Sequence, residues 1–179
     1  MKKIICFLFL LCCILPATTK ISAATLDDNS SSEESFWDIS EWESLLEEKG
    51  FDLKVVSEDE TQLVVDLFDV NNPRSIDHIA SINILFGTNK TGLTWGITMR
   101  NGHTFTSNKG KLDFNELSRT GNFIRVIESS NISGSFGYST VPANTLAFLM
   151  QARLDGVLVY DGVNQIPYLV TTKSWTPTN

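Results

Sequence analysis

"HIASINILF", residues 78–86, decides the fold, because its apolar side chains recur at every second position. Alternate side chains of a strand point to opposite faces, so Ile82, Ile84 and Phe86 share one face. "LTWGITMR", residues 93–100, has the same period and its own apolar face. Neighbouring strands with one apolar and one polar face predict an antiparallel sheet that is covered on one side.

The same period continues on both sides of this pair of strands. "FDLKVV" and "TQLVVDLF" flank the acidic turn 57–60 and predict a hairpin. The Asn101-Gly102 pair predicts a three-residue turn with a left-handed Gly102, which would pair Ile97 with Phe105 in a further hairpin. The remaining predicted strands are "FIRVIESS", "NISGSFGYS", "GVLVYDG" and "IPYLVTTKSW".

Two helices are expected beside the strands. "ISEWESLLEEKG", residues 39–50, contains a capping box in which Ser40 is the N-cap and Glu43 its partner. "VPANTLAFLMQARLDG", residues 141–156, has Pro142 in its first turn and a broad apolar side. The expected fold class is α+β, a mostly antiparallel β-sheet with an N-terminal helix and a second helix before the last hairpin.

The first 24 residues have the pattern of a secretory signal peptide, in which Lys2 and Lys3 precede twelve apolar residues and a segment of small residues. A stable membrane span takes about 20 apolar residues, so none is expected after cleavage. Residues 25–35 are polar and serine-rich, which predicts a disordered linker. Residues 36–179 are then expected to form a single domain.

All three cysteines of the chain lie in the predicted signal peptide, so the mature chain is cysteine-free. Lipid attachment at Cys12 or Cys13 is the alternative, but Leu11 is not the small residue that such processing normally requires. Exported domains of eukaryotes usually carry disulfides. We therefore expect a secreted or extracytoplasmic protein of the cell envelope of a bacterium.

The chain is acidic, with 14 basic and 21 acidic residues and a net charge of −7. Loss of Lys2, Lys3 and Lys20 with the signal peptide leaves 11 basic and 21 acidic residues. Such a charge disfavours nucleic acid as a partner. Residues 25–60 contain 13 of the acids, which indicates a solvated surface or a contact for a basic partner.

"NISGSFGYS", residues 131–139, is close to the G-x-S-x-G turn that holds a serine nucleophile, here Ser135. Ser133 occupies the position of the first glycine, and both His78 and His103 precede Ser135 instead of following it. A triad in the order histidine, aspartate, serine lacks its usual local signature here. The alternation predicts a plain strand, whose polar outward face contains Ser133, Ser135, Gly137 and Ser139 and whose inward side chains are Ile132, Phe136 and Tyr138.

No spacing of histidine, cysteine or glycine typical of a metal, phosphate or nucleotide site occurs, so neither a metal nor a cofactor is expected. A glycosidase needs two facing carboxylates. The acids after residue 60 offer several candidates, and their spacing does not select a pair. The chain is therefore expected to be a binding protein in preference to an enzyme.

Three hypotheses follow for function. The favoured one is an exported non-catalytic binding protein of the inhibitor or immunity type, which contacts an extracellular or envelope protein through Glu41, Glu43, Glu47, Glu48, Ser133 and Ser135. The second is a protein that binds envelope carbohydrate or an anionic wall polymer through Lys109, Lys111, Arg119 and Arg125. The third is a carboxylate-dependent hydrolase, for which no catalytic residue is assigned.

Overall fold

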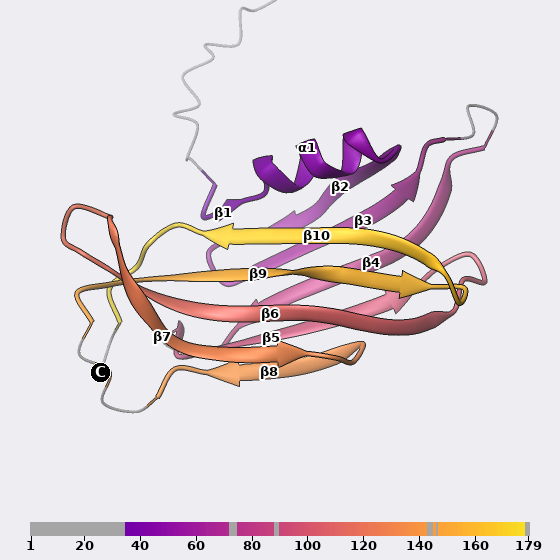
Figure 1. Ribbon diagram of the computed structural model, residues 1–179. Coiled ribbons are helices and arrows are strands. Elements are labelled where there is room, and N and C mark those ends of the chain that lie inside the picture. Colours follow the sequence, from indigo (N-terminus) through magenta and orange to yellow (C-terminus); the bar gives the residue numbers. More distant parts are fainter. Residues whose placement is uncertain (1–34, 72–74, 88–89, 143–144, 146, 178–179) are drawn as a thin grey trace, which may run out of the picture. The chain divides into compact units, whose positions relative to one another are not determined.

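The computed structural model describes residues 35–71, 75–87, 90–142, 145 and 147–177. Within them one α-helix and ten strands follow each other along the chain (Figure 1). Their bounds are β1 (Trp37–Asp38), α1 (Ser40–Glu48), β2 (Phe51–Glu58), β3 (Gln62–Asp69), β4 (Asp77–Phe86), β5 (Gly92–Met99), β6 (Phe105–Leu117), β7 (Phe123–Ile132), β8 (Phe136–Thr140), β9 (Leu149–Tyr160) and β10 (Asn164–Thr172). The predicted signal peptide and the predicted linker, apart from Ser35, lie outside the described residues.

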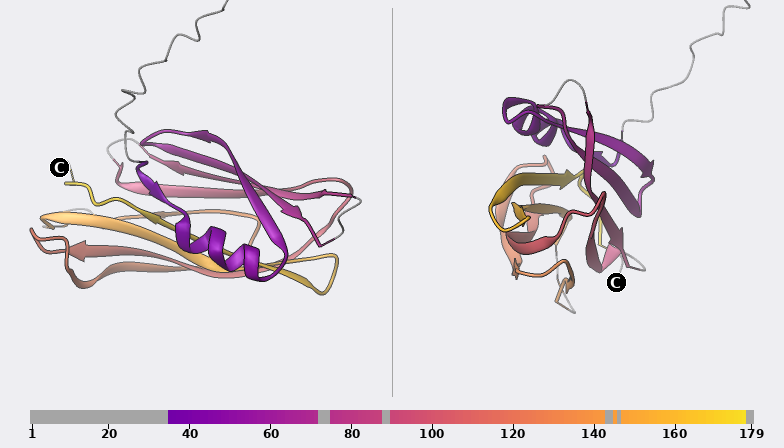
Figure 2. Two further views of the ribbon diagram at one scale, coloured as in Figure 1. Left: turned by 90° about the horizontal axis from the view of Figure 1, so that it is seen from above. Right: turned by 90° about the vertical axis from the view of Figure 1, so that its right-hand side faces the viewer.

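The ten strands form two sheets of five strands, seen as two layers in Figure 2. The first sheet has the order β1-β10-β9-β6-β7, and the second has the order β2-β3-β4-β5-β8. Neighbouring strands are antiparallel throughout both sheets. The prediction of a mostly antiparallel fold is confirmed, with one short helix in the described residues.

The core lies where the apolar faces of the two sheets meet. Ile82, Ile84 and Phe86 of β4 are at most 8% exposed, as their shared face requires. The first sheet contributes Leu112 and Phe114 of β6, which are fully buried in the same cluster. Burial of one such side chain contributes about 1.5–3 kcal/mol, so this common core is the main source of stability.

The predicted second helix is wrong, because residues 149–160 form strand β9. Its inward side chains recur with a period of two, and Met150, Ala152 and Leu154 are all at most 3% exposed. Leucine, methionine, alanine and glutamine favour helices, which explains the error. β9 pairs with β10 on one side and with β6 on the other, and this pairing overrides the local propensity.

The predicted hairpin at Asn101-Gly102 is also wrong in its pairing. Gly102 does have a left-handed backbone, with φ of +81°. The strands on either side belong to different sheets, since β5 pairs with β4 and β8 whereas β6 pairs with β7 and β9. Residues 100–104 therefore cross from one sheet to the other and do not return along β5.

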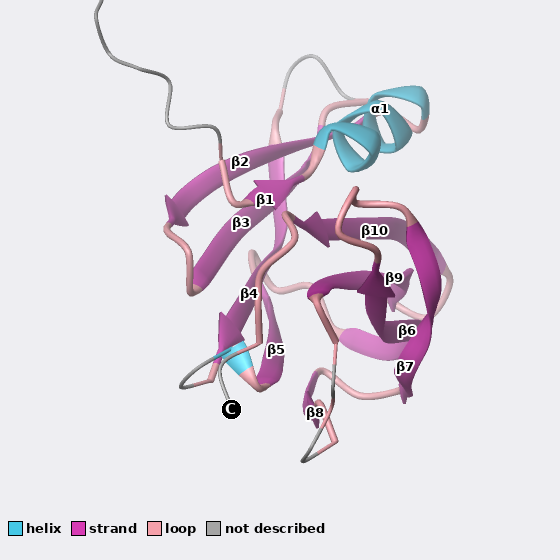
Figure 3. Ribbon diagram, turned by 90° about the vertical axis from the view of Figure 1, so that its left-hand side faces the viewer, coloured by secondary structure: helices cyan, strands magenta, loops and turns pink. Residues whose placement is uncertain are grey.

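Helix α1 lies beside β2 and β10, at one lateral side of the two sheets (Figure 3). The predicted capping box is absent, since Ile39 is the N-cap and makes no side-chain cap. Instead, the Asp38 carboxylate accepts hydrogen bonds from the backbone N–H and the hydroxyl of Ser40. Trp42 is fully buried and donates from Nε1 to the Pro167 carbonyl at 2.9 Å, which attaches the helix to β10.

Tyr168 connects β10 to the far side of the first sheet through the interior. Its ring extends over Gly156 of β9 and Gly110 of β6, which are directly opposite each other in the ladder. Its hydroxyl donates to Oδ1 of Asn108 at 2.9 Å, and Nδ2 of Asn108 donates to the Gly134 carbonyl at 3.2 Å. A chain of polar contacts, buried at Tyr168 and partly buried at Gly134, thus runs from β10 to the turn between β7 and β8.

We predict that Gly110→Ala destabilises the protein, because the added methyl group would overlap the Tyr168 hydroxyl and lie 2.5 Å from the Asp155 carbonyl oxygen. Overpacking of this kind typically lowers the free energy of unfolding by about 1–3 kcal/mol. Urea denaturation measures the change. Gly134→Ala is the matched control, since its methyl group would meet its nearest neighbour at 3.4 Å, and equal losses in the two variants would contradict this account of Tyr168.

Candidate functional site

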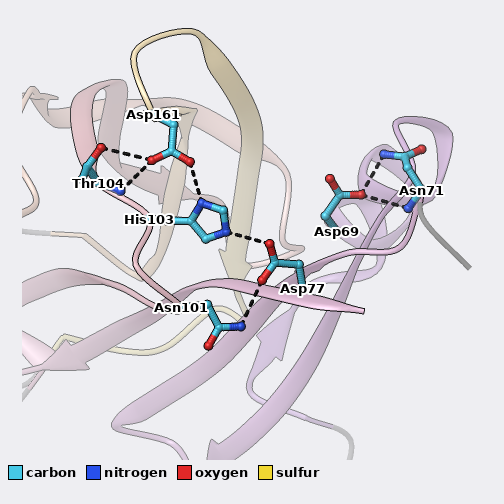
Figure 4. Close-up of polar contacts among 7 residues, drawn as sticks. All are labelled: Asp69, Asn71, Asp77, Asn101, His103, Thr104 and Asp161. Carbon is cyan, nitrogen blue, oxygen red and sulfur yellow. Dashed lines mark hydrogen bonds and ion pairs between the residues drawn. The ribbon is translucent and has the colours of Figure 1, made fainter. Parts of the chain in front are cut away.

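A cluster of polar side chains surrounds His103 where three chain segments meet (Figure 4). Nδ1 of His103 lies 2.5 Å from Oδ2 of Asp161, and Nε2 lies 2.9 Å from Oδ2 of Asp77. Asp77 begins β4 in the second sheet, whereas Asp161 follows β9 in the first sheet. His103 lies in the crossing between β5 and β6, so one imidazole ring connects the two sheets.

Further hydrogen bonds orient the two carboxylates toward the ring. Asn101 Nδ2 donates to Asp77 Oδ1 at 3.0 Å, and the backbone N–H and hydroxyl of Thr104 donate to Asp161 Oδ1. Asn101 and Asp161 have left-handed backbones, with φ of 48° and 47°, and a glycine follows each. Asn-Gly and Asp-Gly pairs favour tight turns with such angles. These two turns hold the polar groups around His103 in a defined geometry.

In this cluster, each ionised group stabilises the ionised form of its neighbours. The hydrogen bond to Asp161 is the largest influence on His103 and, with Asp77, raises the pKa of the imidazole above its ordinary value of 6.5. Hydrogen bonds from Asn101 and then His103 lower the pKa of Asp77. The hydrogen bond from His103 lowers the pKa of Asp161. The cluster therefore favours an imidazolium between two carboxylates.

Tyr160 and Asp69 lie on the border of this cluster. The Tyr160 ring stands edge-on to His103, with 5.3 Å between the ring centroids. Burial is the main cause that raises the pKa of the Tyr160 phenol, and the negative charge of Asp69 adds to it. Asp69 itself accepts two hydrogen bonds from Asn71, at 2.9 and 3.0 Å (Figure 4).

The geometry makes His103 a clamp between the sheets, because both ring nitrogens are engaged and neither is free to act as a base. A carboxylate hydrolase also needs an acid that stays protonated, which requires a raised pKa. The pKa values of Asp59, Asp77 and Asp161 are lowered by hydrogen bonds, so none of these three aspartates has the character of such an acid. In the same part of the chain, no group of three histidine, cysteine or acidic residues is arranged to hold a metal ion.

A second polar cluster lies between β3 and β4. Ser81 Oγ donates to Asp66 Oδ1 at 2.5 Å and accepts from Arg100 Nε at 2.9 Å. His78 Nε2 lies 3.3 Å from the same Asp66 oxygen, but the two atoms do not have the geometry of a hydrogen bond. In a serine hydrolase the histidine stands between the acid and the serine. Here the acid contacts the serine directly, so the cluster does not have the order of that triad.

Ser135 is not part of a catalytic triad, because His103 is bonded to two aspartates and the neighbour of His78 is Asp66. The Ser135 backbone carbonyl accepts a hydrogen bond from the Ile97 N–H at 2.7 Å, as in an ordinary sheet margin. Ser133 is exposed and Ser135 is partly exposed, in the turn between β7 and β8.

The predicted orientation of β8 is reversed. Phe136 and Tyr138 are exposed, whereas Ser139 is buried and Gly137 lies against the Trp95 ring of β5. A methyl group at residue 137 would overlap that ring, so only a glycine allows β8 to approach β5 here. The bulky Trp95 takes the inward space, and the β8 aromatics face solvent as a result.

β7 and β8 together form a lateral side of the fold that we call the β7–β8 margin, residues 123–140. It lies opposite α1 in Figures 1 and 3. A hydrogen bond of 2.7 Å between the hydroxyls of Ser130 and Ser139 joins its two strands. Beside this contact is a pocket of about 400 Å³, lined by Glu128, Ser130, Tyr138, Ser139, Thr140 and Pro142.

The residues predicted to bind a protein partner fall into two separate places. The four glutamates of α1 are all exposed, and Glu41 has its Oε2 3.8 Å from Nη1 of Arg153. Ser133 and Ser135 lie on the β7–β8 margin, at the opposite lateral side (Figure 1). The fold does not bring these two groups into one surface.

Three of the four bases predicted to bind a polymer are engaged locally. Lys111 pairs with Asp113 at 3.0 Å, and Arg125 pairs with Glu116 at 2.7 Å. The Arg119 guanidinium lies 4.5 Å from the centroid of the Phe148 ring. The two carboxylate partners, Asp113 and Glu116, weaken the positive field that an anionic polymer would need.

Comparison of the chain with protein-family models, with curated proteins and with solved structures found no match. Among the described residues, no helix has the length and apolar character to cross a bilayer.

Sequence reasoning missed the His103 cluster because its partners are 26 and 58 positions away. The only local signals were the Asn101-Gly102 and Asp161-Gly162 pairs, which indicate turns and do not indicate that the turns meet. His103 had the pattern of an exposed loop residue. In the structure its side chain is only 18% exposed.

We predict that the stability of the protein falls as the pH rises above neutrality. Because the folded-state pKa of His103 is raised, its contribution is complete below about pH 6.5 and is lost as the pH rises through the folded-state value. Asp77 and Asp161, whose pKa values are lowered, contribute above about pH 4 and lose this contribution on acidification. The free energy of unfolding, measured in urea from pH 4 to 9, should therefore be highest between about pH 4 and 6.5.

The variant His103→Gln should lack the decrease above pH 6.5, whereas His78→Gln should retain it. A decrease of the same size in His103→Gln and in the unsubstituted protein would show that another group causes it.

Proposed function

We propose that this chain is an exported, non-catalytic binding protein that acts through surface contact with another extracellular macromolecule. One observation carries the proposal: the four exposed aromatic side chains of the described residues are distributed along β7 and β8 or lie next to the turn that precedes β7. They are Phe123 (62% exposed), Phe136 (70%), Tyr138 (69%) and Phe148 (57%). The proposal of export depends on the signal-like pattern of residues 1–24.

Exposed aromatics of this kind are unfavourable unless another molecule covers them. A partly exposed apolar face costs hydrophobic free energy in water, and aromatic side chains are enriched where proteins contact partners. Three of the four lie on β7 or β8, and Phe148 contacts Arg119 in the turn that leads into β7. Their distribution follows one side of the fold and avoids the faces that α1 occupies.

The position of β7 in its sheet adds to this argument. β7 pairs only with β6 in the first sheet, and its first residues include the exposed Ile124 and Val126. Exposed sheet edges usually carry charges or prolines that prevent association with other chains. Of the first four residues of β7, only Arg125 is charged, and it pairs with Glu116. An edge with these properties is suited to contact with a partner.

We predict that the double variant Phe123→Ser/Phe136→Ser loses retention of the partner while its stability changes by less than about 0.5 kcal/mol, as is usual for exposed positions. Immobilised protein is exposed to culture fluid and envelope extract, and bound molecules are identified by mass spectrometry. Val163→Ser is the matched control, because Val163 is 77% exposed in the turn between β9 and β10. If both variants retain the same molecules as the unsubstituted protein, the β7–β8 margin is not the contact.

The acidic face of α1 is a second candidate contact, for a basic partner. Glu47 and Glu48 lie in the last turn of α1, which contains no basic residue. Carboxylates at this end interact unfavourably with the helix dipole, typically by about 0.3–1 kcal/mol. Residues that cost stability at an exposed position are consistent with a role in binding.

We predict opposite effects of Glu47→Gln/Glu48→Gln on stability and binding. The free energy of unfolding should rise by about 0.3–1 kcal/mol, because the unfavourable charges at the helix end are removed. Binding of a basic partner should weaken, and for the unsubstituted protein it should also weaken with salt. The control Asp52→Asn removes an exposed charge from β2; if it weakens binding as much as the helix variant, net charge and not α1 is responsible.

A further inference from the structure

We propose that the pocket between β7 and β8 binds a neutral sugar residue of an extracellular glycan. This inference depends on the proposed function, because it names the chemistry of the ligand at the β7–β8 margin. The inference concerns only the residues that line the pocket. The basic residues considered for a wall polymer and the acidic face of α1 are not part of it.

The pocket has a buried polar base and a more exposed rim. Ser130 and Ser139 share a hydrogen bond of 2.7 Å, and Ser139 is only 6% exposed. Tyr138, Thr140 and Pro142 are exposed around them. The volume of about 400 Å³ lies within the range of ligand pockets in proteins. It can admit one or two sugar rings and is open toward the rest of a chain.

The lining matches the hydrogen-bonding character of a sugar. Serine and threonine hydroxyls both donate and accept, and the Glu128 carboxylate accepts only. A sugar presents many hydroxyl groups at close spacing, each of which can donate to Glu128 and also bond to a serine or threonine. A peptide backbone offers one donor and one acceptor per residue, so it would satisfy fewer of these groups at once.

The aromatic side chains beside the pocket supply the apolar part of such a site. Tyr138 lines the pocket, and Phe136, two residues before it on the same face of β8, lies near Gly96 of β5. The face of an aromatic ring carries negative charge density, which attracts the weakly positive C–H groups on one face of a pyranose ring. The two exposed rings thus extend the pocket along β8 for further sugar units.

The charge of the pocket selects a neutral ligand. Among the described residues that line the pocket, Glu128 is the only charged side chain, and none is a base. A carboxylate repels the phosphates or carboxylates of an anionic polymer, especially where solvent access is reduced. The same carboxylate accepts hydrogen bonds from neutral hydroxyl groups without this penalty.

The test uses the full chain in the form that cells release, labelled with ¹⁵N, and follows its amide resonances during titration. The probes are chitotetraose, maltotetraose, cellotetraose and mannotetraose at up to about 10 mM, with tetragalacturonate as the anionic comparison. We expect at least one neutral probe to shift the resonances of Glu128, Ser130, Ser139 and Thr140. Tetragalacturonate should bind more weakly than that probe.

Four variants make the result specific. Tyr138→Ala and Glu128→Gln should each weaken binding of the active probe by about tenfold, through loss of the ring contact and of a charged acceptor. The controls Val163→Ala and Asp52→Asn remove an exposed apolar side chain and an exposed carboxylate outside the pocket and should leave binding unchanged. Resonances distant from the pocket report in each case that the variant is folded.

The absence of binding by all four neutral probes overturns the inference, as does binding that Tyr138→Ala and Glu128→Gln leave unchanged. Stronger binding of tetragalacturonate would equally contradict it. The proposed function is judged separately, by retention of macromolecules on Phe123→Ser/Phe136→Ser. If the pocket binds no sugar but the β7–β8 margin still retains a partner, the inference about sugar is refuted and the proposed function stands.

Discussion

Each sheet of this protein has one apolar face, and the rest of the structure depends on the burial of these two faces against each other. Alternation along β3, β4 and β5 supplies one face, and β6, β9 and β10 supply the other. Because both sheets also have open lateral sides, burial is incomplete unless each side is closed. α1 closes the side next to β2 and β10, and the contact of β7 with β8 closes the other.

The two closures differ in their chemistry. The buried Trp42 attaches α1 through an apolar ring and a hydrogen bond to the Pro167 carbonyl. The β7–β8 side is closed by a pair of serine hydroxyls and by the polar chain from Tyr168 through Asn108 to Gly134. α1, which is attached through apolar contacts, leaves its glutamates exposed to solvent. The β7–β8 margin, which is attached through polar contacts, leaves aromatic rings exposed to solvent. The two proposed contact surfaces, α1 and the β7–β8 margin, therefore differ in chemistry and lie on opposite sides of the fold.

The titratable groups contribute mainly to the joining of the sheets. His103 lies between Asp77 and Asp161, and Asp66 lies next to Ser81, so the residues with catalytic potential already satisfy one another. On β7 and β8, by contrast, the described residues include exposed aromatic rings and the lining of a pocket. These exposed aromatic rings and this pocket are the observations that support the proposed function.

The sequence by itself determined the strands from Phe51 to Met99, the short helix and the antiparallel class, because apolar periodicity is a local property. The sequence predicted a helix that extends into residues 149–160, because several of these residues favour helices. They form a strand because β10 and β6 pair with them on both sides. It also reversed Phe136 and Tyr138, since the Trp95 ring that takes the inward space comes from another strand. Only the tertiary structure brings His103 to Asp77 and Asp161 and forms the pocket at Glu128. His103 and these aspartates are far apart along the chain, and no periodic pattern in the sequence relates them or the residues of the pocket.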